Sequence, residues 1–421
     1  MVAVAVAAAL ASPASASPPI PASAKGKDAP LHYIGSVELL PEDGVLLAGW
    51  TIVVADSTRD SLDLLLSGDF GTASVSGPGV AAMSHKPDED GRLRRYSIAL
   101  SPPQGGSDRI VKISYGGRFV PGPMPINTVD PRKIELTVDS FWFPFDARYD
   151  TRITADVQLR VDGTWTALGA GEMAPTPKGH RLVQADPGLD VALVLLADPV
   201  EARRDEAAIY DARTEAGSRI DALLAAVDGC RAYLNGLAGP AGPLPSTQLV
   251  VTDRADGGWS RGALIALTDI ENEDEEALRQ LVCHELAHHW SRANAGGPDN
   301  WINEGVADHL ANMAVRHVMG EDIYRARLAR YREQLKGAAL PPIWRPGATD
   351  RPPHLVLYRA APLALADLED RMGREGFAAF MSALMAVPPR GTDDFLEALE
   401  RQAGPQLRDG FAAQLARQTI R

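Results

Sequence analysis

Residues 281–290 read Leu-Val-Cys-His-Glu-Leu-Ala-His-His-Trp, and this stretch decides how the C-terminal half of the chain is interpreted. It contains the pattern H-E-x-x-H among apolar residues that recur at helical spacing, so we expect a helix here. On a helix, His284 and His288 lie one turn apart on one face, where both imidazoles can bind one tetrahedral zinc ion. Glu285 is rotated by about 100°, so its carboxylate can reach a water on the metal without being a ligand. Alone, the pattern also fits a structural helix with two surface histidines.

A second motif supplies a third ligand. Residues 301–308 read Trp-Ile-Asn-Glu-Gly-Val-Ala-Asp and begin a helix that we expect to end near Gly320. A Gly- and Pro-containing turn at 296–300 allows the two helices to pack antiparallel, which brings Glu304 to the metal. Asp308, one turn further, is expected to accept the free N–H of a ligating histidine and so fix its ring. The two motifs together predict a site for one Zn²⁺ ion.

These two motifs resemble the zinc signature of the aminopeptidase-N-like gluzincin metallopeptidases, H-E-L-A-H-Q-W followed by W-L-N-E-G-F-A. The resemblance implies a thermolysin-like catalytic domain in which His284, His288 and Glu304 hold zinc and Glu285 is the general base. Residues 358–363, Tyr-Arg-Ala-Ala-Pro-Leu, resemble the family's Y-x-K-G-A segment, which implies that Tyr358 stabilises the oxyanion. The alternative for this tyrosine is a packing role on an amphipathic helix. Upstream, Ser-Phe-Trp-Phe-Pro at 140–144 resembles the end of the family's β-domain.

The chain departs from the family where a substrate's α-amine would bind. The exopeptidase motif G-x-M-E-N is matched by Gly-Gly-Trp-Ser-Arg at 257–261, so Ser260 replaces the amine-binding glutamate and Arg261 the asparagine. An arginine repels an α-ammonium and could instead meet a carboxylate or carbonyl of the substrate. We expect an extended peptide to add to a strand at 263–267. The predicted substrate-binding residues are Gly258, Ser260, Arg261, Gly262 and Ala263.

Two further departures bear on function. Fifteen residues separate His288 from Glu304, where the family usually has eighteen, and the family's large C-terminal helical domain is not expected. We therefore predict a zinc peptidase with an open cleft, an endopeptidase or an atypical exopeptidase. The alternatives are a conventional aminopeptidase with another amine anchor, such as Asp269 or Glu271, and a catalytically weak peptide-binding envelope protein. Hydrolysis of a non-peptide ester or epoxide would use the same metal site.

Length and composition limit the number of domains, the partners and the kind of metal site that the chain can have. The chain has 421 residues, enough for two or three domains, and a formal net charge of −13, which argues against a nucleic-acid partner. Two cysteines exclude a multi-cysteine zinc cluster, and Cys230 and Cys283 either form one disulfide or remain two buried thiols. The expected partner is a peptide or protein substrate, and the oligomeric state stays open.

The remaining sequence divides into a strand-rich region and a helix-rich region. Short alternating runs separated by Gly, Pro, Asp and Ser clusters predict an antiparallel β-sandwich over 31–200. The region 201–421 is predicted to be mainly helical, with a long amphipathic helix at 207–236 and strands at 248–251 and 263–267. The predicted fold class is therefore α+β and multidomain, with a β-sandwich followed by a catalytic domain that has a small sheet.

The first 30 residues form a predicted leader. Residues 2–11 are apolar and residues 14–16 read Ala-Ser-Ala, as expected of a signal peptide with its cleavage site. The alternative is an Ala/Pro/Ser-rich leader with no targeting role. No later run is long and apolar enough to cross a membrane, so stable membrane insertion is not expected. The protein is predicted to be exported, either to a periplasm or as a secreted protein.

Overall fold

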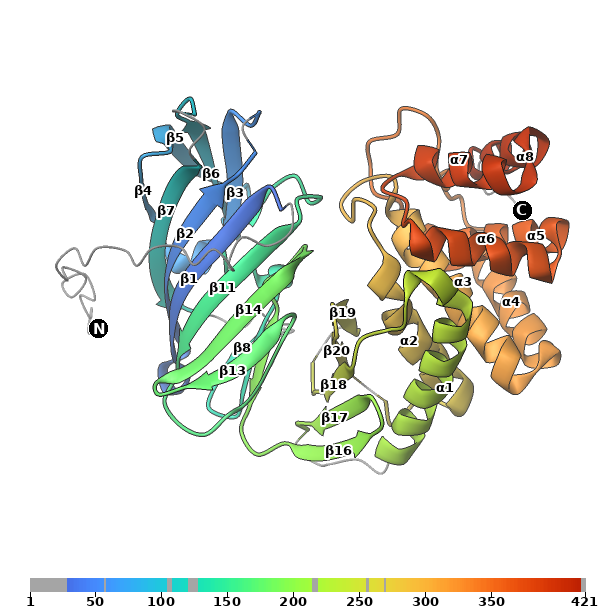
Figure 1. Ribbon diagram of the computed structural model, residues 1–421, viewed down its shortest axis with the longest axis horizontal. Coiled ribbons are helices and arrows are strands. Elements are labelled where there is room, and N and C mark those ends of the chain that lie inside the picture. Colours follow the sequence, from blue (N-terminus) through green and yellow to red (C-terminus); the bar gives the residue numbers. More distant parts are fainter. Residues whose placement is uncertain are drawn as a thin grey trace.

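The computed structural model describes residues 29–417 except 57, 104–107, 120–127, 214–218, 255–256 and 269. The predicted leader and signal peptide therefore lie almost wholly outside the described residues. Figure 1 shows a β-domain on the left, helices on the right and a small sheet between them. The predicted α+β multidomain fold class is confirmed.

Within the described residues, the N-terminal strands form three sheets of seven, four and four strands. Their orders are β13-β14-β11-β1-β2-β7-β4, then β10-β3-β6-β5, then β12-β15-β9-β8. The bounds are β1 Leu31–Leu40, β2 Val45–Val54, β3 Ser61–Ser67, β4 Ser74–Ser76, β5 Val80–Pro87, β6 Leu93–Leu100, β7 Arg109–Arg118, β8 Thr128–Val129, β9 Lys133–Leu136, β10 Phe145–Asp146, β11 Ile153–Arg160, β12 Thr166–Gly169, β13 Glu172–Thr176, β14 Gly179–Gly188 and β15 Leu193–Leu196.

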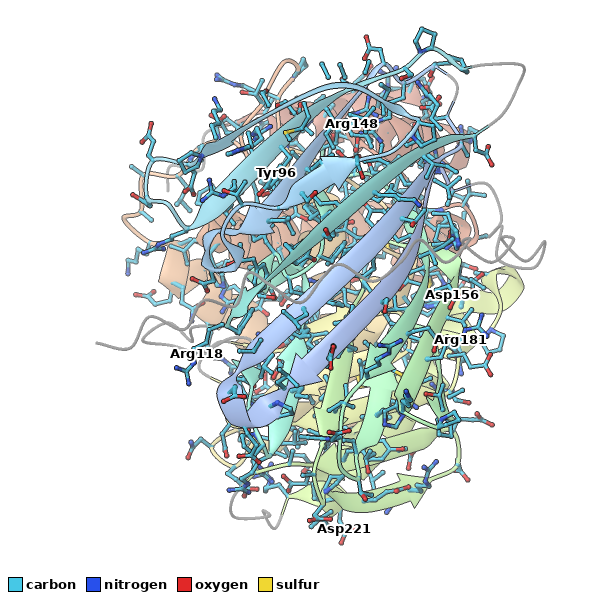
Figure 2. The ribbon with its side chains drawn as sticks, turned by 90° about the vertical axis from the view of Figure 1, so that its left-hand side faces the viewer. Tyr96, Arg118, Arg148, Asp156, Arg181 and Asp221 are labelled. Atoms are coloured by element: carbon cyan, nitrogen blue, oxygen red, sulfur yellow. A yellow bond between two sulfur atoms is a disulfide. The ribbon has the colours of Figure 1, made fainter. Side chains whose placement is uncertain are left out.

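Side chains alternate along these strands between a buried aromatic core and solvent. Inside, Trp50 packs edge-on against Tyr33 and Trp142, with ring centroids 6.0 and 5.6 Å apart. Figure 2 looks onto the seven-stranded sheet, where Arg181 and Asp156 point toward one another and form an ion pair of 2.6 Å. The prediction of a purely antiparallel sandwich is wrong at one pair, because β1 runs parallel to β11. The long stretch of chain between these two strands permits that arrangement.

A five-stranded sheet begins the C-terminal half, in the order β16-β17-β18-β20-β19. Its strands are β16 Val200–Arg204, β17 Ala207–Asp211, β18 Thr247–Val251, β19 Trp259–Arg261 and β20 Leu264–Leu267. The prediction of one helix over 207–236 is wrong at its start: 207–211 is a fully buried strand that pairs parallel with β18. A strand buried on both faces shows no alternation, so its sequence resembles that of a buried helix.

One helix, α1, lies between β17 and β18 in the chain, the other helices follow the small sheet, and together they enclose one apolar core. They are α1 Ile220–Ala238, α2 Glu275–Ala287, α3 Asn300–Met319, α4 Glu321–Leu335, α5 Ala361–Met372, α6 Arg374–Ala386, α7 Thr392–Ala403 and α8 Pro405–Leu415. The Asp274 carboxylate caps α2 by accepting the Ala277 N–H at 2.8 Å. The helix α3 ends at Gly320, whose φ of +95° favours glycine, as expected from the sequence. None of the described helices is long and apolar enough to span a bilayer.

Two features tie the elements around α2 together. Cys230 on α1 and Cys283 on α2 form a disulfide with their Cα atoms 5.1 Å apart, which settles the alternative left open by the sequence. Cys283 is therefore a cross-link and not only a packing residue. A separate apolar cluster joins the β8–β9–β12–β15 sheet to the five-stranded sheet; its members are Leu168, Ala192, Val194, Leu196, Ala208, Tyr210, Val250, Trp259, Leu264 and Ala266. The β-domain thus packs directly against the sheet that borders the predicted site.

Candidate active site

The three predicted metal ligands meet between α2 and α3. His284 lies in the last turn of α2, His288 begins the short 3-10 turn η6 (His288–Trp290), and Glu304 lies in the first turns of α3. The Nε2 atoms of the two histidines are 3.1 Å apart, and Oε2 of Glu304 is 3.5 Å from each of them. Among the described residues, these three form the group whose geometry could hold a metal ion.

The separations fit zinc. With bonds of about 2.1 Å, two ligand atoms of a tetrahedral zinc ion are about 3.4 Å apart. The three measured distances lie close to that value. Oε2 of Glu304 is buried and has no hydrogen-bond donor among the described residues. Two imidazoles and a carboxylate oxygen form a donor set that zinc favours, so the residues present fit the ion.

Charge is balanced within this group. Burial opposes protonation of His284, but its contact with Glu304 and the charges of Glu285, Glu304 and Asp308 raise the pKa of His284 to about 9. Burial lowers the pKa of His288 to about 4. The pKa of Glu304 is lowered, because its two histidine neighbours outweigh the effect of burial. A divalent cation would take the place of the His284 proton.

The outer nitrogens of the two histidines have different partners. Nδ1 of His288 is 3.1 Å from Oγ of Ser291. Nδ1 of His284 faces Oδ1 of Asp308 at 3.9 Å, which is too long for the predicted hydrogen bond. The carboxylate of Asp308 instead accepts hydrogen bonds from three other side chains, those of Gln280, Asn312 and Tyr331. Asp308 therefore lies behind His284, held in place by this network.

Glu285 lies on the other flank of the triad, next to the edge of the small sheet. It is 6% exposed, and burial raises its pKa to about 7 against the opposing charge of His284. A Cβ placed on Gly258 would lie 3.4 Å from Oε1 of Glu285 and 2.8 Å from the Ala266 carbonyl oxygen. Gly258 thus lets the backbone before β19 approach this carboxylate closely.

Tyr358 joins the site from a third direction. It lies in the π-helical turn η7 (Val356–Ala360), with its ring stacked on His354 at 4.4 Å and 5.6 Å from the ring of His284. The pKa shifts of Tyr358 and Glu304 show that its hydroxyl lies close enough to the Glu304 carboxylate to interact with it. Burial and the charge of Glu304 raise the pKa of Tyr358, which keeps the hydroxyl protonated. The structure therefore brings together the three predicted metal ligands, the predicted general base Glu285 and the predicted oxyanion donor Tyr358.

The substrate-binding prediction needs correction. The strand at 264–267, β20, is internal to the sheet and pairs with β18 and β19 on its two sides, so it has no free edge. Among the described residues, the sheet has β16 at one edge and β19 at the other, and β19 contains Ser260 and Arg261. Gly262 and Ala263 form the β19–β20 turn; Gly262 has φ +63° and packs against the Ala170 carbonyl of the β-domain. The glycine-rich approach to β19 hid this strand from sequence analysis.

Arg261 is engaged by the β-domain. Its Nε lies 3.0 Å from Oδ2 of Asp190, and its Nη1 donates to the Ser260 carbonyl at 2.8 Å. A second buried acid, Glu135 on β9, accepts the indole N–H of Trp259 at 2.9 Å. Neither acid was predicted, because both are more than 60 residues away from β19 in the sequence. The two contacts fix the edge strand from the side of the β-domain.

The predicted alternative amine anchors receive no support. Glu271 accepts a hydrogen bond of 2.9 Å from Nη1 of Arg213, which also pairs with Asp211. Its carboxylate is thus already neutralised by a cation. Asp269 lies outside the described residues.

The fold is that of the M1 zinc metallopeptidases. The M1 zinc metallopeptidase of Deinococcus radiodurans superposes with a TM-score of 0.70 at 15% identity, over 94% of this chain and 96% of that chain. A mutant of that protein bound to a Tyr-Ser-Ala substrate gives 0.68 at 16% identity, with the same shares covered. Native yeast LTA4 hydrolase gives 0.72 at 14% identity, over 97% of this chain and 71% of that chain. No family model and no curated sequence matches the chain.

Zinc binding should raise the thermal stability of the protein. A ligand that binds only the folded state at 100 times its Kd adds about 2.7 kcal/mol to the free energy of unfolding. We expect the midpoint of thermal unfolding of the metal-free protein to rise on titration with Zn²⁺ and to fall again with a chelator. The variant His288→Ala should lose this rise, whereas His317→Ala, at the far end of α3, should keep it. An unchanged midpoint in the unmutated protein would contradict the site.

Proposed function

We propose that the protein is a zinc-dependent peptidase that hydrolyses peptide bonds between β19 and the ligand helices. The observation that carries this proposal is the position of Glu285: a buried carboxylate flanking three convergent metal ligands, beside an edge strand. A module that only binds peptides has no need for such a carboxylate. The M1 fold supports the same conclusion.

The chain's residues divide the chemistry between them. Bound zinc supplies a Lewis acid that polarises a carbonyl and lowers the pKa of a coordinated water to about 7. Glu285 accepts the proton of the attacking water and afterwards donates it to the departing amine. The Tyr358 hydroxyl, which lies beside Glu304, donates a hydrogen bond to the oxygen that gains negative charge. The β19 backbone holds the peptide in an extended conformation by strand addition.

The surroundings of β19 favour an endopeptidase or an atypical exopeptidase. Ser260 and Arg261 lie where a free α-amine would need an acid. The acid beside them, Asp190, already forms an ion pair with Arg261. The charge of Arg261 also acts on Glu285, which places a cation beside the reacting centre. An α-ammonium would meet this positive charge rather than a free carboxylate.

The decisive experiment compares two kinds of substrate. One is an internally quenched peptide with a blocked N-terminus, and the other is a set of aminoacyl fluorogenic substrates with a free amine. We expect the zinc-loaded protein to cleave the blocked peptide, and a chelator to abolish cleavage. Cleavage of the aminoacyl substrates alone would instead establish an aminopeptidase with an unrecognised amine anchor. Zinc-dependent binding without hydrolysis of either substrate would contradict the proposal.

Replacing Tyr358 by phenylalanine should lower kcat without affecting zinc. Removal of one oxyanion donor typically costs about 10²–10³ in kcat. We expect such a loss for Tyr358→Phe, with unchanged zinc content and KM within about threefold, since the donor acts mainly on the transition state. Tyr233→Phe, on α1, is the matched control and should retain full activity. Retention of kcat in Tyr358→Phe would assign this tyrosine to packing.

We also propose that the protein is exported, to a periplasm or as a secreted protein. The apolar run at 2–11 followed by small residues supports this, as does the Cys230–Cys283 disulfide, since such bonds persist mainly in oxidising compartments. N-terminal sequencing of the protein from a fractionated culture should find the leader removed in the exported fraction. Recovery of the intact leader in the cytosol would contradict export.

A further inference from the structure

Two arginines from different domains converge on one carbonyl group beside the metal ligands. Arg152 directly precedes β11 of the β-domain, and its Nη2 lies 3.4 Å from the Ser291 carbonyl oxygen. Arg292 follows η6, and its Nη1 donates to the same oxygen at 2.7 Å and to the His289 carbonyl at 2.9 Å. The two guanidinium groups are therefore neighbours, although 139 residues separate Arg152 from Ser291.

This arginine pair is adjacent to the reacting centre. Oγ of Ser291 is 3.1 Å from Nδ1 of His288, so the residue that joins the two arginines also contacts a metal ligand. Arg261, on the edge strand that is to hold the peptide, lies close enough for its charge to act on both Arg152 and His288. The pair therefore lies behind His288, on the side of its ring away from the metal ligands, and near Arg261 of the edge strand, where it could meet a substrate residue beyond the bond that is cleaved.

The positive charge of the pair is not neutralised locally. In the part of the chain that the structure describes, Arg261 forms an ion pair with Asp190, but neither Arg152 nor Arg292 forms one with any carboxylate. Burial and the charges of Arg292, Arg261 and Arg390 lower the pKa of Arg152 to about 10; Asp150 opposes this only weakly. Like charges held together destabilise one another, and an anion between them would relieve the repulsion.

We propose that Arg152 and Arg292 form a subsite for a carboxylate of the peptide substrate. Each guanidinium presents a planar set of N–H donors that matches the two oxygens of a carboxylate. The resulting charge-assisted hydrogen bonds are strong and fix the orientation of the bound carboxylate. The carboxylate belongs either to the C-terminus of a short peptide or to an Asp or Glu side chain. This inference rests on the proposed function and adds to it a preference for anionic peptides.

Binding to the inactive, zinc-loaded Glu285→Gln variant tests the subsite without turnover. The probes are Tyr-Ser-Ala with a free C-terminal carboxylate and the same tripeptide as its amide. A second pair, Tyr-Asp-Ala amide and Tyr-Asn-Ala amide, separates side-chain carboxylates from terminal ones. We expect the acid of at least one pair to bind about tenfold more tightly than its neutral partner, as for one good charge-assisted contact.

Substitution of the arginines should remove this preference. In Arg152→Gln and Arg292→Gln the ratio should fall to about twofold or less, with neutral peptides bound as before and zinc retained. Arg152→Lys should restore part of it, since it keeps the charge but not the planar fork. Arg325→Gln is the control, because this arginine is 72% exposed and pairs with Glu321 on α4.

Two outcomes would overturn the subsite: equal binding of acid and neutral probes in both pairs, or a preference that survives both substitutions. The proposed function is judged separately, by hydrolysis with the unmutated enzyme. Carboxylate preference without any hydrolysis would contradict the peptidase and leave the subsite standing. Hydrolysis without the preference would contradict the subsite alone.

Discussion

Glu285→Gln should abolish peptide hydrolysis while the protein keeps its zinc. The amide has nearly the shape of the carboxylate but cannot accept the proton of the attacking water, and general-base catalysis of this kind contributes about 10²–10⁴ in rate. The carboxylate is buried, so bulk solvent does not readily substitute for it. We therefore expect kcat to fall toward the upper end of that range. The measurement is kcat on the blocked quenched peptide together with zinc content per chain.

The matched control lies ten residues earlier on the same helix. Glu275 has a side chain that is 73% exposed, and Glu275→Gln makes the same chemical change far from the metal. It should retain full activity and the same zinc content. If Glu285→Gln kept more than about a tenth of the kcat, a loss well below the expected range, another group would have to be the base.

The second large effect concerns stability. The Cys230–Cys283 bond closes a loop whose ends are 53 residues apart, and the chain-entropy relation for such a loop gives about 4 kcal/mol. We expect the variant Cys230→Ala/Cys283→Ala to lose about this much free energy of unfolding in urea. Because Cys283 is followed directly by His284, we also expect weaker zinc binding as α2 becomes less firmly held on α1.

A reducing agent gives the matching control. Dithiothreitol should shift the urea midpoint of the unmutated protein toward that of the double variant and leave the variant unchanged. A loss below about 1 kcal/mol, a quarter of the loop-closure value, would show that packing of α1 on α2 holds these helices without the bond.

Short-range patterns predicted the metal centre because its spacing is local. The positions of His284 and His288 follow from one helical turn, and the bounds of α3 follow from the turn before it and Gly320 after it. Only the meeting of Glu304 with the histidines required the two helices to pack, and a short connection makes that pairing natural. The role of Asp308 was predicted less well, since its hydrogen bonds go to residues on three helices.

Contacts between distant segments were beyond the sequence. The edge strand β19 is three residues long and follows two glycines, so neither length nor alternation marks it as a strand. Its place at the edge depends on β20 pairing with β18, which only the assembled sheet reveals. The disulfide and the arginine pair likewise join residues 53 and more than 100 positions apart.

The contact between the β-domain and the five-stranded sheet constrains how the sequence of such a protein can evolve. Asp190 of the β-domain neutralises the charge of Arg261 on the edge strand. A neutral residue at 190 would therefore leave the Arg261 cation without its partner beside the site. A substitution at one of these two positions must therefore be compensated by a substitution at the other. Among relatives we expect a basic residue at 261 only where an acid occupies 190, and the two halves to be inherited as a matched set rather than exchanged.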